Sequence, residues 1–226
     1  MGQLLATWQA RVQAYVRDAG AVDVSTTQAT DVGITPALAQ YSIDRPHVVA
    51  ADLTPVARYL PLPSTAAGWI DGFSRILSIE APAGETPPAT LSSGSWMFAR
   101  DPLLPATIRV LMPWELEVGA AARVEFTTAW PTPTATAADD LVSSVAFPAV
   151  TSLAAAMILT TMSAEAARSR QGAMPTDFVD GTERAARFQD AAAQLRILYN
   201  TMIGLGSATG GPGAASKRLQ SIRLTT

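Results

Sequence analysis

The residue types that most often catalyse reactions or bind metals are scarce in this chain. His47 is the only histidine, and cysteine is absent. A site with several histidines, a thiol nucleophile and a cysteine metal site are therefore excluded. His47 follows Pro46 and precedes two valines, a setting typical of a strand edge or an interface.

The remaining candidates for chemistry have simpler structural explanations. Asp139 and Asp140 could hold a metal, but adjacent residues at a helix start point apart, and capping explains them better. The glycine-rich residues 206–217 lack the Gly-Lys-Ser/Thr of a phosphate loop. Ser92 and Ser95 have no nearby base. We therefore expect no catalytic residue, no metal and no cofactor, and hence no enzyme.

The chain has five tryptophans. Such rings can stack on bases or sugars, but packing in a core or at an interface is the more common role. The five are Trp8, Trp69, Trp96, Trp114 and Trp130.

Charge is low and unevenly distributed. Charged residues form 15% of the 226-residue chain, against about 25% in typical soluble domains. This composition predicts that other subunits cover part of the surface. Residues 205–226 carry three basic residues and no acid, so the tail is +3 and the remainder of the chain −6.

Helices are predicted at the N-terminal end. Leu5, Trp8, Val12 and Tyr15 recur at helical spacing, and the run ends at Asp18-Ala19-Gly20. A second, short helix should begin near Asp31 or Thr35, with Leu38, Tyr41 and Ile43 on its face, and stop before Pro46.

The middle of the chain has the pattern of strands. Short runs rich in β-branched and aromatic residues alternate with proline and glycine. The runs are residues 75–80, 95–98, 107–111 and 123–127. They predict a small antiparallel sheet.

Two long helices are predicted after residue 139. The first could reach Gln171, with Pro148 as a kink or as its true first turn. Residues 141–164 are uncharged and long enough to span a bilayer, but they include seven Ser or Thr. We therefore interpret them as a surface shared between subunits. In the last helix Phe188, Ala191, Leu195, Leu198 and Met202 form a 3-4 seam.

The predicted fold class is α+β. A mostly helical body has a small antiparallel sheet inserted between the N-terminal helices and a long C-terminal helical pair. The expected parts are residues 1–46 and 139–204 for the helical body, 47–138 for the β-rich insertion, and 205–226 for an extended tail.

Over residues 30–203 the chain resembles the head–tail adaptor (connector or head-completion) proteins of tailed bacteriophages and gene transfer agents. The similarity lies in the order and type of several segments rather than in one strict motif. These segments are Leu38-Ala39-Gln40-Tyr41-Ser42 to Arg45-Pro46, Tyr59-Leu60-Pro61-Leu62 with Gly68-Trp69, residues 74–84, Pro87-Pro88, Ile108-Arg109-Val110-Leu111, Ala154-Ala155-Ala156, Val179-Asp180, Arg187-Phe188 and Leu198-Tyr199. The β-rich insertion departs from the smallest, purely helical adaptors.

The resemblance implies a structural subunit of the virion neck, assembled in the host cytoplasm. Twelve copies would form a ring beneath the portal, in contact with tail or neck proteins, and DNA would pass through without sequence recognition and without a membrane. The basic tail would dock on the portal through Lys217, Arg218, Leu219, Ile222 and Arg223. Another virion protein, such as a tail terminator or a minor capsid protein, is the alternative.

Overall fold

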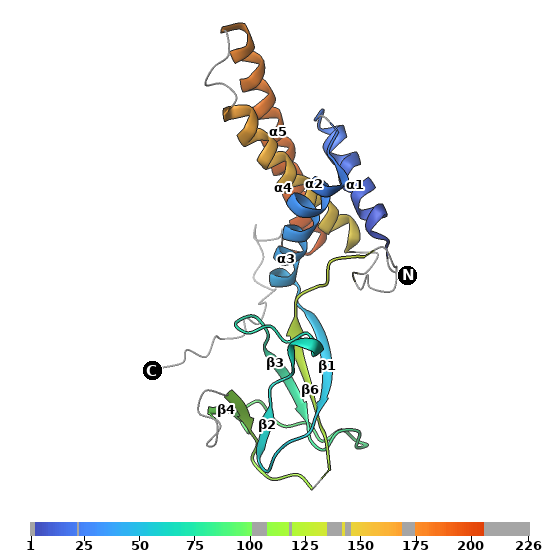
Figure 1. Cartoon of the computed structure of the whole chain (residues 1–226), viewed down its shortest axis with the longest axis vertical. Coiled ribbons are helices and arrows are strands. Elements are labelled where there is room, and N and C mark those ends of the chain that lie inside the picture. The colour runs from blue at the N-terminus through green and yellow to red at the C-terminus, as the bar shows by residue number, and fades with distance from the viewer. Residues whose placement is uncertain are drawn as a thin grey trace. The chain divides into compact units, whose positions relative to one another are not determined.

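The computed structural model describes residues 3–21, 23–100, 108–117, 119–134, 142, 146–168 and 175–205. By its contacts the chain divides into two units (Figure 1). A helical unit comprises Ala6–Gly33 and Ser143–Thr226, and a β unit comprises Met1–Leu5 and Ile34–Val142. The predicted α+β class is confirmed, with helices from both ends of the chain and strands between them.

The first helix of the helical unit is α1, Leu5–Asp18. Trp8, Val12 and Val16 are its buried residues, so the predicted stripe is correct in its centre and extends to Val16. The helix ends as expected, because Gly20 adopts a left-handed conformation with φ of 75°.

A short α2, Thr26–Gln28, follows and continues into a π-helix, η1, Ala29–Ile34. The Ser25 side chain caps this segment by accepting from the Gln28 N–H at 3.1 Å, and Gln28 accepts from the Ser25 N–H in return. The predicted helix start near Asp31 or Thr35 corresponds to that of α3 at Thr35, and the earlier start at Thr26 was not predicted.

The long helical pair consists of α4, Phe147–Arg168, and α5, Pro175–Met202. Pro148 lies in the first turn of α4, so it begins the helix and does not kink it. Ser163 Oγ donates to the Ala185 carbonyl at 2.9 Å, and Arg196 Nη2 donates to Thr160 Oγ1 at 3.2 Å. The order of these contacts makes the pair antiparallel.

The buried seam of α5 is rotated from the predicted one. Phe188 is buried as expected, but Met202 is 45% exposed. From residue 182 to the turn that follows α5, the other buried residues are Ala185, Ala192, Tyr199 and Ile203. The seam still follows a helical 3-4 spacing, so the periodicity was right and the phase was wrong by one position over much of its length.

The apolar helix α4 is covered mainly by its own chain. Every residue from Ala149 to Ala156 is buried. The Trp8 ring meets the Phe147 ring edge-on at 4.9 Å, and Gly33 of η1 packs against Ile158. By length and composition α4 could also cross a membrane, but 61% of its apolar window is buried in the protein. The expectation that this stretch is a surface between subunits is therefore wrong for most of its length.

The β unit begins with α3, Thr35–Asp44, which the sequence analysis assigned to the helical body. Pro36 stands in its first turn, and Leu38 and Tyr41 are buried as predicted, whereas Ile43 is 65% exposed.

In the part of the chain that the structure describes, six strands follow α3. The short 3-10 helix η2, Thr65–Ala67, lies between β2 and β3. The strands are β1 His47–Leu53, β2 Tyr59–Pro61, β3 Ile76–Glu80, β4 Met97–Arg100, β5 Ile108–Leu111 and β6 Ala122–Thr128. They form two antiparallel three-stranded sheets, in the orders β1-β6-β3 and β2-β5-β4. The prediction of a single sheet is therefore wrong in number, although its antiparallel character is confirmed.

The two sheets pack on one shared hydrophobic core. Val124 and Phe126 of β6 and Ile79 of β3 meet Leu60 of β2 and Val110 of β5, all fully buried. On β6 these residues alternate with Arg123 and Glu125, which face the other side of the sheet. The alternation explains why β6 was visible in the sequence.

Candidate functional site

The predicted portal-docking residues, Lys217, Arg218, Leu219, Ile222 and Arg223, lie outside the described residues. The same holds for Asp139, Asp140 and the glycine-rich residues 206–213. In the described part of the chain no group of three or more His, Asp or Glu could hold a metal ion.

His47 lies beside Trp130, which connects the segment after β6 to the end of α3. Its ring centroid is 4.5 Å from that of Trp130, which in turn lies 5.7 Å from the Tyr41 ring. The Trp130 backbone N–H donates to Ser42 Oγ at 2.9 Å, and the Trp130 indole N–H donates to the Arg45 carbonyl at 2.6 Å. The two bonds attach the chain after β6 to the end of α3.

The environment of His47 disfavours its charged form. Its Nδ1 is buried and makes no hydrogen bond within the described part of the chain. Burial lowers the pKa of His47 below its ordinary value, and burial also raises the pKa of Tyr41. His47 is the first residue of β1, an edge strand, as one of the two predicted settings had it, and its aromatic neighbours and lowered pKa favour packing over proton transfer.

The tryptophans serve mainly as packing residues. Trp8 is fully buried in the helical unit, and Trp69 is 8% exposed and packs on Phe126 in the core of the β unit. Trp96 is half-buried and meets Phe98 edge-on at 5.8 Å. Trp114 is 49% exposed, so it is more accessible to a partner than Trp8, Trp69 and Trp96.

A charged cluster covers the outer face of the β1-β6-β3 sheet. Arg123 donates to the Asp52 carboxylate at 2.8 and 3.1 Å and lies 3.9 Å from Glu80. The hydrogen bond from Arg123 lowers the pKa of Asp52. Arg123 of β6 is directly opposite Asp52 of β1 on one side and Glu80 of β3 on the other. The cluster therefore has the geometry of ordinary cross-strand pairs.

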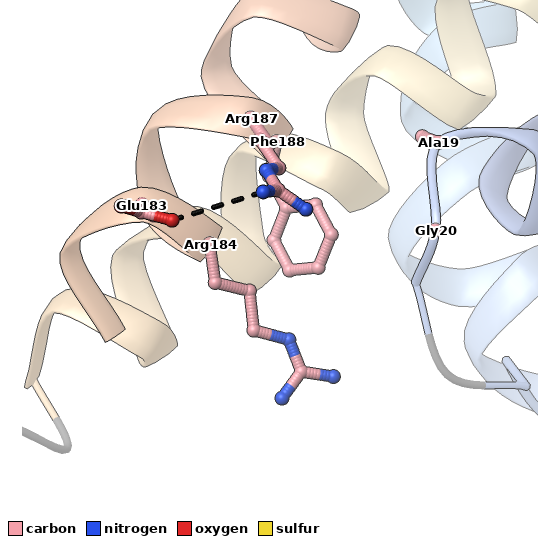
Figure 2. Close-up of a pocket in the computed structure, with 6 residues that line it drawn as sticks. All are labelled: Ala19, Gly20, Glu183, Arg184, Arg187 and Phe188. Atoms are coloured by element: carbon pink, nitrogen blue, oxygen red, sulfur yellow. Dashed lines mark ion pairs between the residues drawn. The ribbon is translucent and has the colours of Figure 1, made fainter. Parts of the chain in front are cut away.

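A groove of about 320 Å³ lies between the end of α1 and α5 (Figure 2). Its lining residues are Ala19, Gly20, Glu183, Arg184, Arg187 and Phe188. The Arg184 guanidinium lies 5.8 Å from the centre of the Phe188 ring, and Arg187 pairs with Glu183 at 3.7 Å. With two guanidinium groups beside one carboxylate, the charged side chains that line the groove carry a net positive charge. Arg187 and Glu183 are 77% and 63% exposed, so their pair is weak.

A second groove, of about 160 Å³, lies between the α2–η1 segment and α4. It has an apolar floor and a polar rim with two carboxylates. Its lining comes from residues 23–32 and 158–165, which are more than a hundred positions apart in the sequence. The sequence analysis missed both grooves because only the packing of α1, η1 and α5 on α4 brings their sides together.

No family model, curated protein or solved structure matches the chain. The function must therefore be argued from its own residues and geometry.

Proposed function

We propose that the protein is a structural virion subunit, a head-to-tail adaptor that forms a ring between the portal and the tail or neck proteins. The observation that carries the proposal is the architecture, a helical unit made from both ends of the chain with a β unit inserted between them. A helical body is what the resemblance to adaptor proteins implied, whereas the inserted β unit departs from the smallest, purely helical adaptors. The adaptor acts by geometry and has no catalytic role.

The C-terminal end of the helical unit supports an assembly role. Ile197 is 65% exposed, Met202 45% and Leu205 52%, so large apolar side chains face solvent where α5 leads into the tail. Exposed apolar side chains close to one another are typical of surfaces that a partner covers. The basic tail begins at this point, which suits docking on a second ring.

The charge distribution fits a channel through which DNA passes. Outside residues 205–226 the chain carries a net charge of −6. A negative body repels the phosphate backbone, so DNA can move through the ring without being held. Twelve subunits around a closed channel follow from the resemblance alone and are part of the proposal.

The alternative is another virion protein, such as a tail terminator or a minor capsid protein. A closed sheet without a long helical pair would favour such a protein. The presence of α4 and α5, of 22 and 28 residues, favours the adaptor. A carbohydrate-binding module receives little support, because Trp8 and Trp69 are buried.

Deletion of residues 207–226 tests the docking role. The shortened chain and the full chain are each mixed with the portal ring, and the mass of the complexes is measured. We expect the full chain to add to the portal ring and the shortened chain to remain free. A full-length variant with Lys217, Arg218 and Arg223 changed to Gln keeps the tail length and isolates the charge. Unchanged binding by the shortened chain would refute tail docking.

A further inference from the structure

The groove between the α2–η1 segment and α4 has the character of a peptide-binding site. Its eight lining residues divide into two sets. The floor is apolar and consists of Val24, Val32, Ile158 and Met162, and the rim consists of the exposed residues Asp23, Gln28, Thr161 and Glu165. Its volume of about 160 Å³ is close to that of cavities that accept a benzene ring, so it can take one branched apolar side chain.

The rim carries negative charge. Asp23 and Glu165 are both exposed, and Glu165 has no ion pair among those found in the described residues. Asp23 lies 3.4 Å from Arg17, but their side chains are 86% and 70% exposed, so that pair is easily exchanged. A segment with an apolar side chain and basic neighbours would therefore complement both floor and rim.

The C-terminal tail contains such a segment. Residues 217–224 read Lys-Arg-Leu-Gln-Ser-Ile-Arg-Leu, with apolar side chains at Leu219, Ile222 and Leu224 and basic ones at Lys217, Arg218 and Arg223. It holds the chain's single lysine and has no acid. We infer that residues 217–224 bind in the groove of their own chain, with Leu219 or Ile222 on the floor and the basic side chains at Asp23 and Glu165.

The length of the tail permits this binding within one chain. Ser163, beside the groove, bonds to Ala185 of α5. Thr160, also beside the groove, bonds to Arg196. Leu205 is nine residues beyond Arg196 and twenty beyond Ala185, so it lies about 14–30 Å from the groove along the hairpin, at about 1.5 Å per residue. The chain from Leu205 to Lys217 can extend to about 40 Å, at about 3.3 Å per residue. A tethered segment that reaches its site has an effective concentration of about millimolar, so weak contacts suffice.

The inference does not depend on the adaptor function. If the same segment docks on a portal, the groove would hold it in the free subunit and release it on assembly. A portal-docking tail need not be held in the groove, and a held tail need not dock on a portal. An experiment on the isolated full chain therefore separates the two proposals.

The absence of cysteine makes the test direct. One double variant, T161C/S221C, places a thiol on the groove rim and another in the tail, and a second, T201C/S221C, is the matched control. Thr161 and Thr201 are both exposed on helices and donate to the carbonyl four residues before them. Disulfide formation within one chain is followed by mass in a glutathione buffer, corrected for the reactivity of each single variant.

The inference predicts that the disulfide forms about tenfold or more faster in T161C/S221C than in T201C/S221C. An unbound tail gives the opposite order, because Thr201 is only four residues before Leu205, whereas Thr161 follows Thr160, which bonds to Arg196, about 14 Å or more along the hairpin from Leu205. Adding E165K to both double variants should remove the preference, as should high salt, whereas D190K, an exposed charge reversal on α5, should leave it intact.

Three results would overturn the inference. Faster or equal disulfide formation in T201C/S221C means that the tail is unbound. An unchanged preference in the presence of E165K means that the rim charge does not hold the tail. Disulfide-linked dimers whose yield rises with protein concentration mean that the groove takes the tail of a second copy.

Discussion

Replacement of Gly33 by alanine tests the closest approach in the helical unit. Gly33 lies in η1 against α4, and a Cβ there would be 2.8 Å from Ile158 Cδ1 and 3.3 Å from the Ala154 carbonyl oxygen. No real Cβ tolerates the first contact, so Ile158 must move. Ile158 is only 3% exposed and can shift its Cδ1 only toward the groove that it lines, and the Ala154 oxygen belongs to the backbone and has little room to yield.

Two effects of G33A oppose each other. Alanine favours a helical backbone by about 1 kcal/mol over glycine. Overpacking a filled core costs about 1–3 kcal/mol. Because one of the three atoms within 3.3 Å of this Cβ belongs to the backbone, we expect the upper part of that range, for a net loss of about 1–2 kcal/mol. For a chain of this size each kcal/mol lowers the Tm by about 2–4 °C.

A second substitution identifies the cause. I158V removes Cδ1, the nearest atom, and alone should cost about 1 kcal/mol. In G33A/I158V the added and removed methyl groups offset each other, so the double variant should be more stable than the sum of the single changes predicts, by about 1 kcal/mol. G94A is the control, because nothing lies within 4 Å of a Cβ at Gly94. Denaturation is followed by far-ultraviolet circular dichroism, and G33A at wild-type stability or above would refute the close approach of η1 to α4.

Three further predictions concern the β unit. S42A should lower the free energy of unfolding by about 1–3 kcal/mol, because the Trp130 backbone N–H loses its acceptor; urea denaturation measures the loss, and wild-type stability would mean that water replaces the hydroxyl. His47 has a lowered pKa in the folded state, so as pH falls below about 6.5 the unfolded chain binds a proton first and stability declines. H47Q should abolish that decline in the free energy of unfolding between about pH 7 and about pH 5, measured by urea denaturation at each pH. An equal dependence on pH in the wild-type protein and in H47Q would contradict this prediction. D52N should barely change the urea midpoint, because Asp52 and Arg123 are 52% and 43% exposed; a large shift would show that this surface pair matters more than its exposure indicates.

Local signals predicted the elements whose residues follow one strong pattern. The stripe of α1, the alternation of β6 and the proline in the first turn of α4 all depend on neighbours in sequence. β1 was missed because Ala50-Ala51-Asp52 lacks β-branched residues; its strand pairs over its full length with β6. β2 was missed because it is only three residues long and ends in Pro61.

The phase of the α5 seam could not be predicted from α5 alone. Leu198 and Met202 are as apolar as Tyr199 and Ile203, so both stripes satisfy the same periodicity. The partner helix decides between them, because Ser163 of α4 meets Ala185 and thereby sets which side of α5 is covered. For the same reason, neither groove was visible in the sequence, since their sides come from segments that only tertiary packing unites.

The burial of α4 changes where an assembly surface must be sought. The sequence interpretation assigned subunit contacts to its uncharged stretch, but the chain covers that stretch with α1, η1 and α5. Low charge in α4 therefore reflects a buried core helix. If the subunits form the proposed ring, their contacts must use apolar side chains that remain exposed. Within the described residues these include Ile197, Met202 and Leu205 of the helical unit, and Met97, Phe98 and Ile108 of the β2-β5-β4 sheet. Since β4 is an edge strand in that sheet, and edge strands readily pair with another chain, the β unit is as strong a candidate for subunit contacts as the end of α5.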